Sequence, residues 1–311
     1  MPTAILATIS LDFDPFLRLG DTGVRLETIA LAGAIFIALG IAAIVAGRTP
    51  VHDPHAPAWA AAVDLHLRRD DLLFIVLGAI PGAVIGGRLG YVLLHVDYYA
   101  ANLGSIADPN QGSLELGLAV LLGSATGAYV CRLLDAPVGR WLHAATIPVL
   151  VGIVVGELAR LLGGSGQGLA FDGPWATAYT GGGPWESLAA ATSAHPTQVY
   201  GALAALLALA VVLVLVRAGA LQARDGSAFF VGIFVWALGR ALVTLAWRDD
   251  PVAGPLRAGT LIALAVALAA LAGLVVTRIL TRRGRRQAHA DHPPEPDPSV
   301  DWPDPLARPR F

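Results

Sequence analysis

Long apolar stretches separated by short polar ones dominate this chain of 311 residues. Each stretch approaches the roughly 20 apolar residues that an α-helix needs to cross the hydrocarbon core of a bilayer. The stretches cover residues 26–47, 72–96, 114–134, 141–163, 198–217, 227–247 and 258–280. The pattern therefore predicts an all-α fold, a polytopic bundle of seven membrane-spanning helices.

The placement of arginine predicts the orientation of that bundle. Arginine supplies all 21 basic residues, and most of those in connections fall on one alternate set. That set contains Arg48, Arg68, Arg69, Arg132, Arg140, Arg217, Arg224, Arg278, Arg282, Arg283, Arg285 and Arg286. The opposite set contains Arg18, Arg25, Arg248 and Arg257. Because basic residues accumulate on the cytoplasmic side, we expect the amino terminus outside and the carboxyl terminus in the cytoplasm.

Composition agrees with a membrane protein. Apolar residues make up 55% of the chain, charged residues make up 14%, and the mean hydropathy is +0.64. This balance excludes a soluble globule, and nothing in it points to nucleic-acid binding. The single cysteine, Cys131, excludes an internal disulfide, and its apolar setting favours a packed thiol over a nucleophile.

The same pattern divides the chain into three parts. Residues 1–25 are predicted to be an extracytoplasmic segment, and residues 26–280 form the seven-helix domain. Residues 281–311 are predicted to be a cytoplasmic tail, basic at first and then proline-rich and disordered from residue 288.

Two connections between spans are long enough to need comment. The connection at 49–71 contains His52, His55 and His66, whose spacing favours a solvated loop over a metal site. The connection at 164–197 is rich in glycine and aromatic residues. Its rings, Trp175, Tyr179 and Trp185, suit the level of the lipid headgroups, so we expect this loop to lie on the outer membrane surface.

Few ionisable groups fall within the spans, and those few lie toward the outer side. They are Arg88, Glu157, Arg160 and Arg240, with Glu115 near the outer end of the third span. Glu157 and Arg160 are three residues apart on one helix and can form a silent ion pair. The remaining guanidinium groups favour an electropositive cavity for a lipid phosphate, although structural pairing or snorkelling would also account for them.

A second polar group stands in "HPTQVY", residues 195–200, at the outer entrance to the fifth span. Pro196 suits the first turn of a helix, where its missing N–H costs nothing. His195, Gln198 and Tyr200 then place hydrogen-bonding groups beside the predicted cavity.

Three stretches, in this order, resemble the bacterial prolipoprotein diacylglyceryl transferases: "GGRLGYVLLH" in the second span, "HPTQVY", and "FFVGIFVWALGRALV" at 229–243. The resemblance covers roughly residues 24–280. It implies a multi-pass enzyme of the bacterial cytoplasmic membrane that moves the diacylglyceryl group of phosphatidylglycerol to the lipobox cysteine of a lipoprotein precursor. It implies neither a metal nor a soluble cofactor.

The resemblance also suggests roles for individual residues. His195 or Glu157 would take the proton of the thiol. Phosphate or lipid would contact Arg88, Arg160, Arg240, Gln198 and Tyr200. A cationic site and a base are what the reaction needs, since a thiolate displaces glycerol 1-phosphate from an anionic lipid.

The chain departs from the family pattern at several polar positions. Where the family reads close to "GRIGNFINGE", this chain reads "GELARLLGGS" at 156–165, so Glu157, Arg160 and Ser165 replace arginine, asparagine and glutamate. The family histidine of an "HGG" segment is missing from "GSLELGLAV" at 112–120. Thr244 and Gly201 replace two further glutamates, and "VRLETIAL" lacks the tyrosine expected near the first span.

Three functions are therefore compared. In the first, the chain is a divergent transferase. Arg160 then supplies the guanidinium of the family arginine from a position one helical turn away, about 5.4 Å along the helix axis. Alternatively it is a catalytically inactive paralogue that binds anionic phospholipid or a lipoprotein precursor. A small-solute transporter would require internal repeats and charges at the membrane midplane, and the sequence shows neither.

Overall fold

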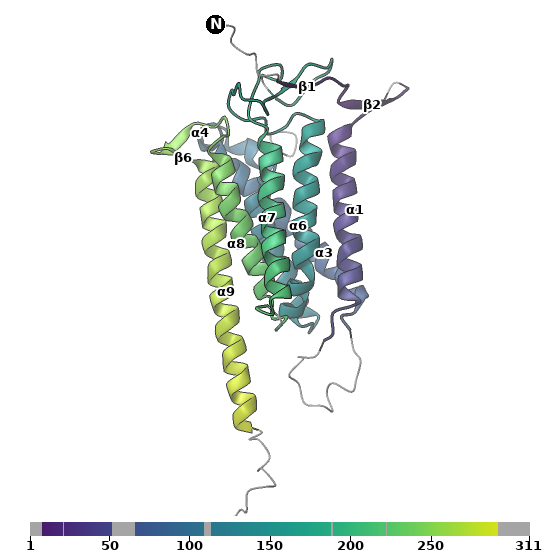
Figure 1. The fold of residues 1–311 in the computed structure, drawn as a ribbon, viewed down its shortest axis with the longest axis vertical. Helices are drawn as coiled ribbons and strands as arrows, with labels where there is room; N and C mark the ends of the chain where they lie inside the picture. The colour runs from purple at the N-terminus through teal and green to yellow at the C-terminus, as the bar shows by residue number, and fades with distance from the viewer. Residues whose placement is uncertain are drawn as a thin grey trace, which may run out of the picture.

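The computed structural model is a bundle of long helices with a cap of loops and short strands at one end (Figure 1). The structure describes residues 8–20, 22–51, 66–108, 113–187, 189–221 and 223–291. Seven of its helices are long and apolar enough to cross a membrane, which confirms the predicted fold. They are α1 (Leu26–Ala46), α3 (Arg69–Leu94), α5 (Leu116–Leu133), α6 (Val138–Ala159), α7 (Thr197–Arg217), α8 (Ser227–Thr244) and α9 (Ala258–Asp291).

Shorter elements gather at the end of the bundle where the chain begins, called here the N-terminal end (Figure 1). Three of them are helical: α4 (Val96–Ala101), η1 (Leu103–Ala107) and η2 (Arg160–Leu162). The strands are β1 (Ile9–Leu11), β2 (Phe16–Leu19), β3 (Thr22–Arg25), β4 (Thr177–Tyr179), β5 (Pro251–Ala253) and β6 (Leu256–Arg257). They pair as β1 with β4, β2 with β3 and β5 with β6, strands that an all-α prediction did not contain.

Two kinds of contact hold the long helices together. Helices α6, α7, α8 and α9 share one apolar core that includes Leu150, Val212, Trp236 and Val266, each buried. Helices α3 and α5 instead approach through glycine: a Cβ at Gly86 would lie 2.3 Å from the carbonyl oxygen of Leu118. Small residues of this kind let membrane helices bring their backbones close together.

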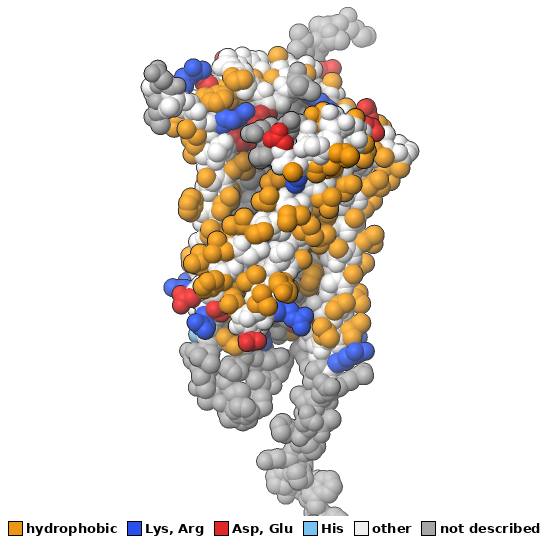
Figure 2. All heavy atoms as spheres, turned by 180° about the vertical axis from the view of Figure 1, so that it is seen from behind, with side chains coloured by type: hydrophobic (Ala, Val, Ile, Leu, Met, Phe, Trp, Pro, Cys, Tyr) orange, Lys and Arg blue, Asp and Glu red, His pale blue; other side chains and the backbone are white. Residues whose placement is uncertain are grey.

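The outside of the bundle is apolar, as a lipid-facing surface requires. Hydrophobic atoms cover the middle of the face in Figure 2, and charged side chains gather toward its two ends. Phe36 is 74% exposed and Leu242 is 71% exposed, values that would be costly for such side chains in water. The chain is therefore a multi-pass membrane protein.

Helix α9 continues beyond the apolar span predicted at 258–280 and ends at Asp291, while residues 292–311 lie outside the described part. Arginine tolerates a helix as well as a loop, so a basic segment does not by itself end one.

The long connection at 164–197 packs against other parts of the protein. Its strand β4 runs parallel to β1 and its Tyr179 is only 2% exposed. Trp185 packs on Tyr179, with ring centroids 4.7 Å apart, and on Phe13 at 5.1 Å. Tyr179 is therefore buried within the protein, whereas Trp175 is 52% exposed.

Candidate functional site

Four of the charges predicted from sequence, Glu115, Glu157, Arg160 and Arg240, meet at the N-terminal end of the bundle. Arg240, on α8, donates from Nη2 to Glu115 Oε1 over 2.8 Å and from Nη1 to Glu157 Oε1 over 3.4 Å. The exposed fraction of each of these three side chains is 7% or less. Residues from three distant parts of the sequence therefore form one buried ion-pair network.

Glu115 is fixed at both of its ends. Its carboxylate caps the start of α5 by accepting hydrogen bonds from the backbone N–H groups of Gly117 and Leu118, both at 2.7 Å. Its own N–H donates to the carbonyl oxygen of Gly87 on α3. A carboxylate at a helix N-terminus also meets the positive end of the helix dipole. Glu115 therefore ties α3 and α5 to Arg240.

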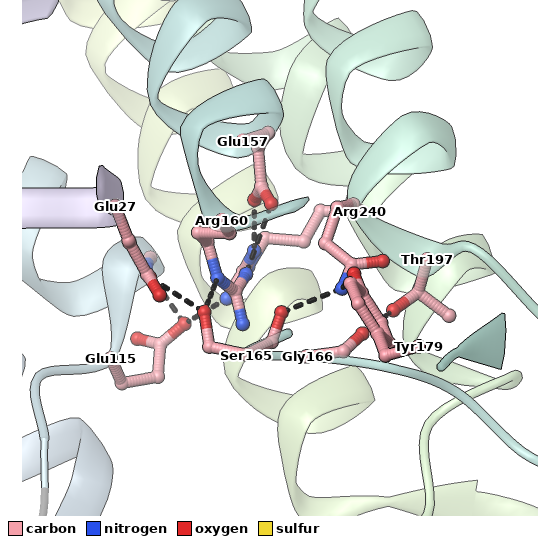
Figure 3. Close-up of polar contacts among 11 residues, drawn as sticks. Glu27, Glu115, Glu157, Arg160, Ser165, Gly166, Tyr179, Thr197 and Arg240 are labelled. Carbon is pink, nitrogen blue, oxygen red and sulfur yellow. Dashed lines mark hydrogen bonds and ion pairs between the residues drawn. The ribbon is translucent and has the colours of Figure 1, made fainter. Parts of the chain in front are cut away.

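Glu157 and Arg160 form the predicted pair, with Arg160 Nη1 2.9 Å from Glu157 Oε2. Figure 3 shows Glu157 facing both guanidinium groups, so each of its oxygens already accepts from an arginine. The side chain of Arg160 remains 30% exposed, against 7% for that of Arg240. Arg160 is therefore the more accessible guanidinium of this network.

The network continues from Arg160 to the first helix through Ser165. Arg160 Nε donates to Ser165 Oγ over 3.4 Å, and that hydroxyl donates to Glu27 Oε1 over 2.6 Å (Figure 3). Glu27 is 8% exposed and lies in the first turn of α1. Sequence reasoning missed Glu27 because its position beside a predicted span end suggests a helix terminus. Its carboxylate just inside an apolar run was the available signal.

The charges of this network do not produce the expected excess of positive charge. It contains two guanidinium groups, Arg160 and Arg240, and three carboxylates, Glu27, Glu115 and Glu157. Each guanidinium has a carboxylate of the protein within ion-pair distance. A buried charge is stable when it is paired and hydrogen-bonded, so no lipid phosphate is needed to hold these arginines in place.

Arg88 lies apart from this network and contacts backbone. Its Nε donates to the carbonyl oxygen of Ile106 over 2.6 Å, and its Nη2 donates to those of Ser105 at 2.6 Å and Asp108 at 3.1 Å. Its guanidinium carbon lies 5.3 Å from the ring centroid of Tyr99, a cation–π distance. These carbonyls come from the end of η1, so Arg88 fastens that turn to α3.

His195 belongs to an aromatic group on the loop before α7. Its ring stacks on Phe171, with centroids 4.0 Å apart, and its Nδ1 lies 3.1 Å from the hydroxyl of Tyr200. The indole N–H of Trp175 donates to that hydroxyl over 2.6 Å. Burial lowers the pKa of His195, so the neutral imidazole is favoured.

Gln198 lies between this loop and the network. Its Nε2 donates to the Ser165 carbonyl oxygen over 2.7 Å and to the Tyr179 hydroxyl over 3.4 Å. Its Oε1 is buried and, like Nε of Arg240, makes no hydrogen bond to the part of the chain that the structure describes. Burial, followed by the charge of Glu27, raises the pKa of Tyr179 to about 12, so this phenol stays protonated.

Arg248 holds the loop in place from the end of α8. It donates to the carbonyl oxygen of Gly168 over 2.6 Å, to Ser187 Oγ over 3.2 Å and to Gln167 Oε1 over 3.1 Å. Backbone bonds from Gly168 to His195 and from Leu169 to Ala246 complete the attachment. The position of His195 thus depends on contacts that the sequence does not reveal.

A metal site does not emerge from the residues that the structure describes: no group of three or more histidine, cysteine, aspartate or glutamate side chains there could hold an ion. Of the three histidines in the connection at 49–71, His52 and His55 lie outside the described residues.

Sequence comparison with known proteins identifies relatives of this chain. The sequence profile described as "Prolipoprotein diacylglyceryl transferase" matches residues 16–276. A protein of Nitrobacter hamburgensis is 27% identical over 294 residues, which cover 93% of this chain and 95% of its own. One of Gluconobacter oxydans is 30% identical over 281 residues, 85% of this chain and 92% of its own. Both carry the name phosphatidylglycerol–prolipoprotein diacylglyceryl transferase. The chain therefore belongs to the prolipoprotein diacylglyceryl transferase family.

Proposed function

We propose that this protein transfers the diacylglyceryl group of phosphatidylglycerol to the lipobox cysteine of lipoprotein precursors, in the bacterial cytoplasmic membrane. One observation carries the proposal. The polar network that joins α1, α5, α6, α7 and α8 through Ser165 and Gln198 lies at one end of an otherwise apolar bundle. Buried charges are costly in a membrane protein and by default mark a functional site.

In this proposal Arg160 receives the phosphate of the lipid. It is the only network guanidinium with a substantially exposed side chain among the described residues, and it can contact an incoming anion while Glu157 holds its other face. Arg240 acts behind it, since it positions Glu157 and Glu115 and is itself buried. A fork-shaped guanidinium suits a phosphate because it offers two parallel donors.

The loop residues supply neutral hydrogen-bonding groups to the same region. His195 and Tyr200 would contact the glycerol headgroup or the precursor, and Gln198 has a buried acceptor, Oε1, that no donor among the described residues engages. Arg88 would act indirectly in the proposal, by shaping the turn at η1.

At two of the family positions that this chain lacks, a carboxylate from elsewhere in the chain lies in the same region. Gly201 stands where the family has a glutamate, and a Cβ there would lie 2.9 Å from the carboxyl carbon of Glu157. Ser165 stands where the family has another glutamate, and its hydroxyl binds Glu27. The two carboxylates therefore come from α6 and α1 instead, which supports a rearranged site over a lost one.

A lipidation assay tests the proposal. Purified protein in vesicles of phosphatidylglycerol should add the mass of a diacylglyceryl group to a lipobox peptide, and a peptide with serine in place of cysteine should stay unmodified. Arg160→Ala should reduce the rate about 100-fold or more, as expected for loss of a charged group that binds the reacting phosphate. Arg18→Ala, an exposed arginine at the same end, should not. A wild-type protein without product, beside an active relative, would overturn the proposal.

One feature favours a second candidate, a binding protein without the reaction. Both oxygens of Glu157 are engaged by arginines, so this residue is poorly placed to accept a proton. Such a protein would retain anionic lipid and fail in the lipidation assay. Native mass spectrometry would show bound phosphatidylglycerol in the wild type and less in Arg160→Ala.

A further inference from the structure

A second histidine lies at the N-terminal end of the bundle, at the junction of α3 and α4. His95 is half-buried, and its ring lies against Tyr91, with centroids 4.3 Å apart. Gly90, five residues earlier, packs against the side chain of Glu115. Five helical residues span about 7.5 Å, so His95 lies about one and a half turns outward from the Glu115–Arg240 pair.

One hydrogen bond determines the tautomer of His95. Nδ1 lies 3.0 Å from the carbonyl oxygen of Tyr91, which can only accept, so Nδ1 carries the proton and donates it. The neutral ring then has its lone pair on Nε2. No other hydrogen bond joins this ring to residues in the described ranges. Nε2 can therefore take a proton without breaking a contact within that part of the protein.

A carboxylate lies within electrostatic range of the same ring. Burial raises the pKa of Asp249, and the nearby His95 and Arg257 act against that rise. Asp249 follows α8 and is held in a turn whose backbone oxygen accepts from Arg257 Nε at 2.7 Å. Tyr91, whose ring lies against His95, is in turn within cation–π distance of Arg88 and in edge contact with Tyr99. Asp97 lies in the first turn of α4, two residues after His95.

His195 is held differently. Its Nδ1 lies 3.1 Å from the Tyr200 hydroxyl, which also accepts from the indole N–H of Trp175. Its ring stacks on Phe171, so aromatic side chains, not a backbone carbonyl, fix the position of His195.

We propose that His95 is the catalytic base of the transfer, an inference that rests on the proposed function. Nε2 takes the proton of the lipobox thiol, and the sulfur forms a bond to the glyceryl carbon of the lipid. The carbon–oxygen bond to the phosphate breaks, and glycerol 1-phosphate leaves with that electron pair. The proton then passes from His95 to the departing phosphate or to water, which returns the imidazole to its neutral form.

Paired peptides test the base. His95→Gln should lower the rate with a cysteine lipobox peptide by about 100-fold to 10,000-fold, the usual contribution of a general base. The same variant should act at close to the wild-type rate on a selenocysteine peptide, because a selenol is already ionised at neutral pH. His143→Gln is the matched control. His143 lies near the start of α6, at the other end of that helix from Glu157, so this change should leave both rates unchanged.

Each outcome separates the two proposals. An inactive wild type on both peptides removes the transferase itself. If the wild type is active and His95→Gln is equally active, His95 is not the catalytic base, and the proposed transferase activity is unaffected. Equal loss on both peptides, in a variant that melts like the wild type, would make His95 a positioning residue and overturn the inference.

Discussion

Arg240 and Arg88 both lie in apolar helices near the same end of the bundle, but the protein satisfies them differently. Arg240 pairs with Glu115 and Glu157, whose carboxylates come from other helices. Arg88 donates to three backbone carbonyls within 20 residues of it in sequence. The first arrangement links distant helices and needs matching charges. The second completes a local turn and needs only the carbonyl oxygens at the end of a short helix, which can accept from a side chain.

The strongest test of this contrast is the loss of Arg240. Arg240→Gln leaves the buried carboxylate of Glu115 without its cation and leaves Glu157 with Arg160 alone, and breaking a buried pair costs about 3–5 kcal/mol. We expect this loss in the free energy of unfolding, measured by denaturation in detergent, together with loss of lipidation.

The double variant Glu115→Gln/Arg240→Gln provides the control for that result. It removes both charges of the closest pair, so it should recover part of the lost stability, as coupled neighbours do. Equal stability of Arg240→Gln and the wild type would show that the ion pairs contribute nothing.

A second test exchanges the positions of the charges. Gly201→Glu places a carboxylate against Glu157, where a Cβ alone would lie 2.9 Å from the carboxyl carbon. We expect a loss of about 1–3 kcal/mol from overpacking and from like-charge repulsion. The triple variant Glu157→Arg/Arg160→Asn/Gly201→Glu restores the family arrangement and should be more stable than Gly201→Glu alone. Thermal melting of the purified proteins ranks them, and a triple variant less stable than the single one would contradict the exchange.

The Arg88 side of the comparison predicts a local effect. Arg88→Ala removes the guanidinium donor from three carbonyl oxygens, of which that of Ser105 still accepts from the N–H of Asp108, and should cost about 1–3 kcal/mol. We expect faster proteolysis within residues 103–108 and unchanged retention of phosphatidylglycerol, whereas Arg160→Ala should lower retention. If Arg88→Ala lowers the retention of phosphatidylglycerol and leaves proteolysis within residues 103–108 unchanged, Arg88 binds the phosphate and does not stabilise the turn.

The smallest effect concerns pH. The pKa of His195 is lower in the folded protein than the value of about 6.5 in an unfolded chain, because burial disfavours the imidazolium. Protonation of His195 therefore favours the unfolded state. The folded state keeps its full stability above the unfolded pKa of His195, and it loses the His195 contribution as the pH falls through the folded pKa. The melting temperature should drop less on acidification for His195→Gln than for the wild type. Identical drops would exclude His195 as the source.

The sequence predicted the parts of this molecule that depend on local pattern. Seven spans follow from runs of apolar residues, and the Glu157–Arg160 pair follows from a spacing of three on one helix. The contacts of Arg240 do not follow, because Glu115 is 125 residues away and nothing local encodes that approach. The place of Glu27 was missed for the same reason, since Ser165, its partner, lies 138 residues away.

The glycine-lined contact between α3 and α5 limits how a two-tailed lipid could enter. A Cβ at Gly82 would lie 2.6 Å from the carbonyl oxygen of Leu122, so the two backbones approach closely and leave little room for side chains between them. A lipid can pass between two helices more easily where flexible side chains line their interface, and the close contact of α3 and α5 has few of them. Lateral traffic from the bilayer must use another part of the perimeter, and a covalent bridge between α3 and α5 should leave lipid exchange unaffected.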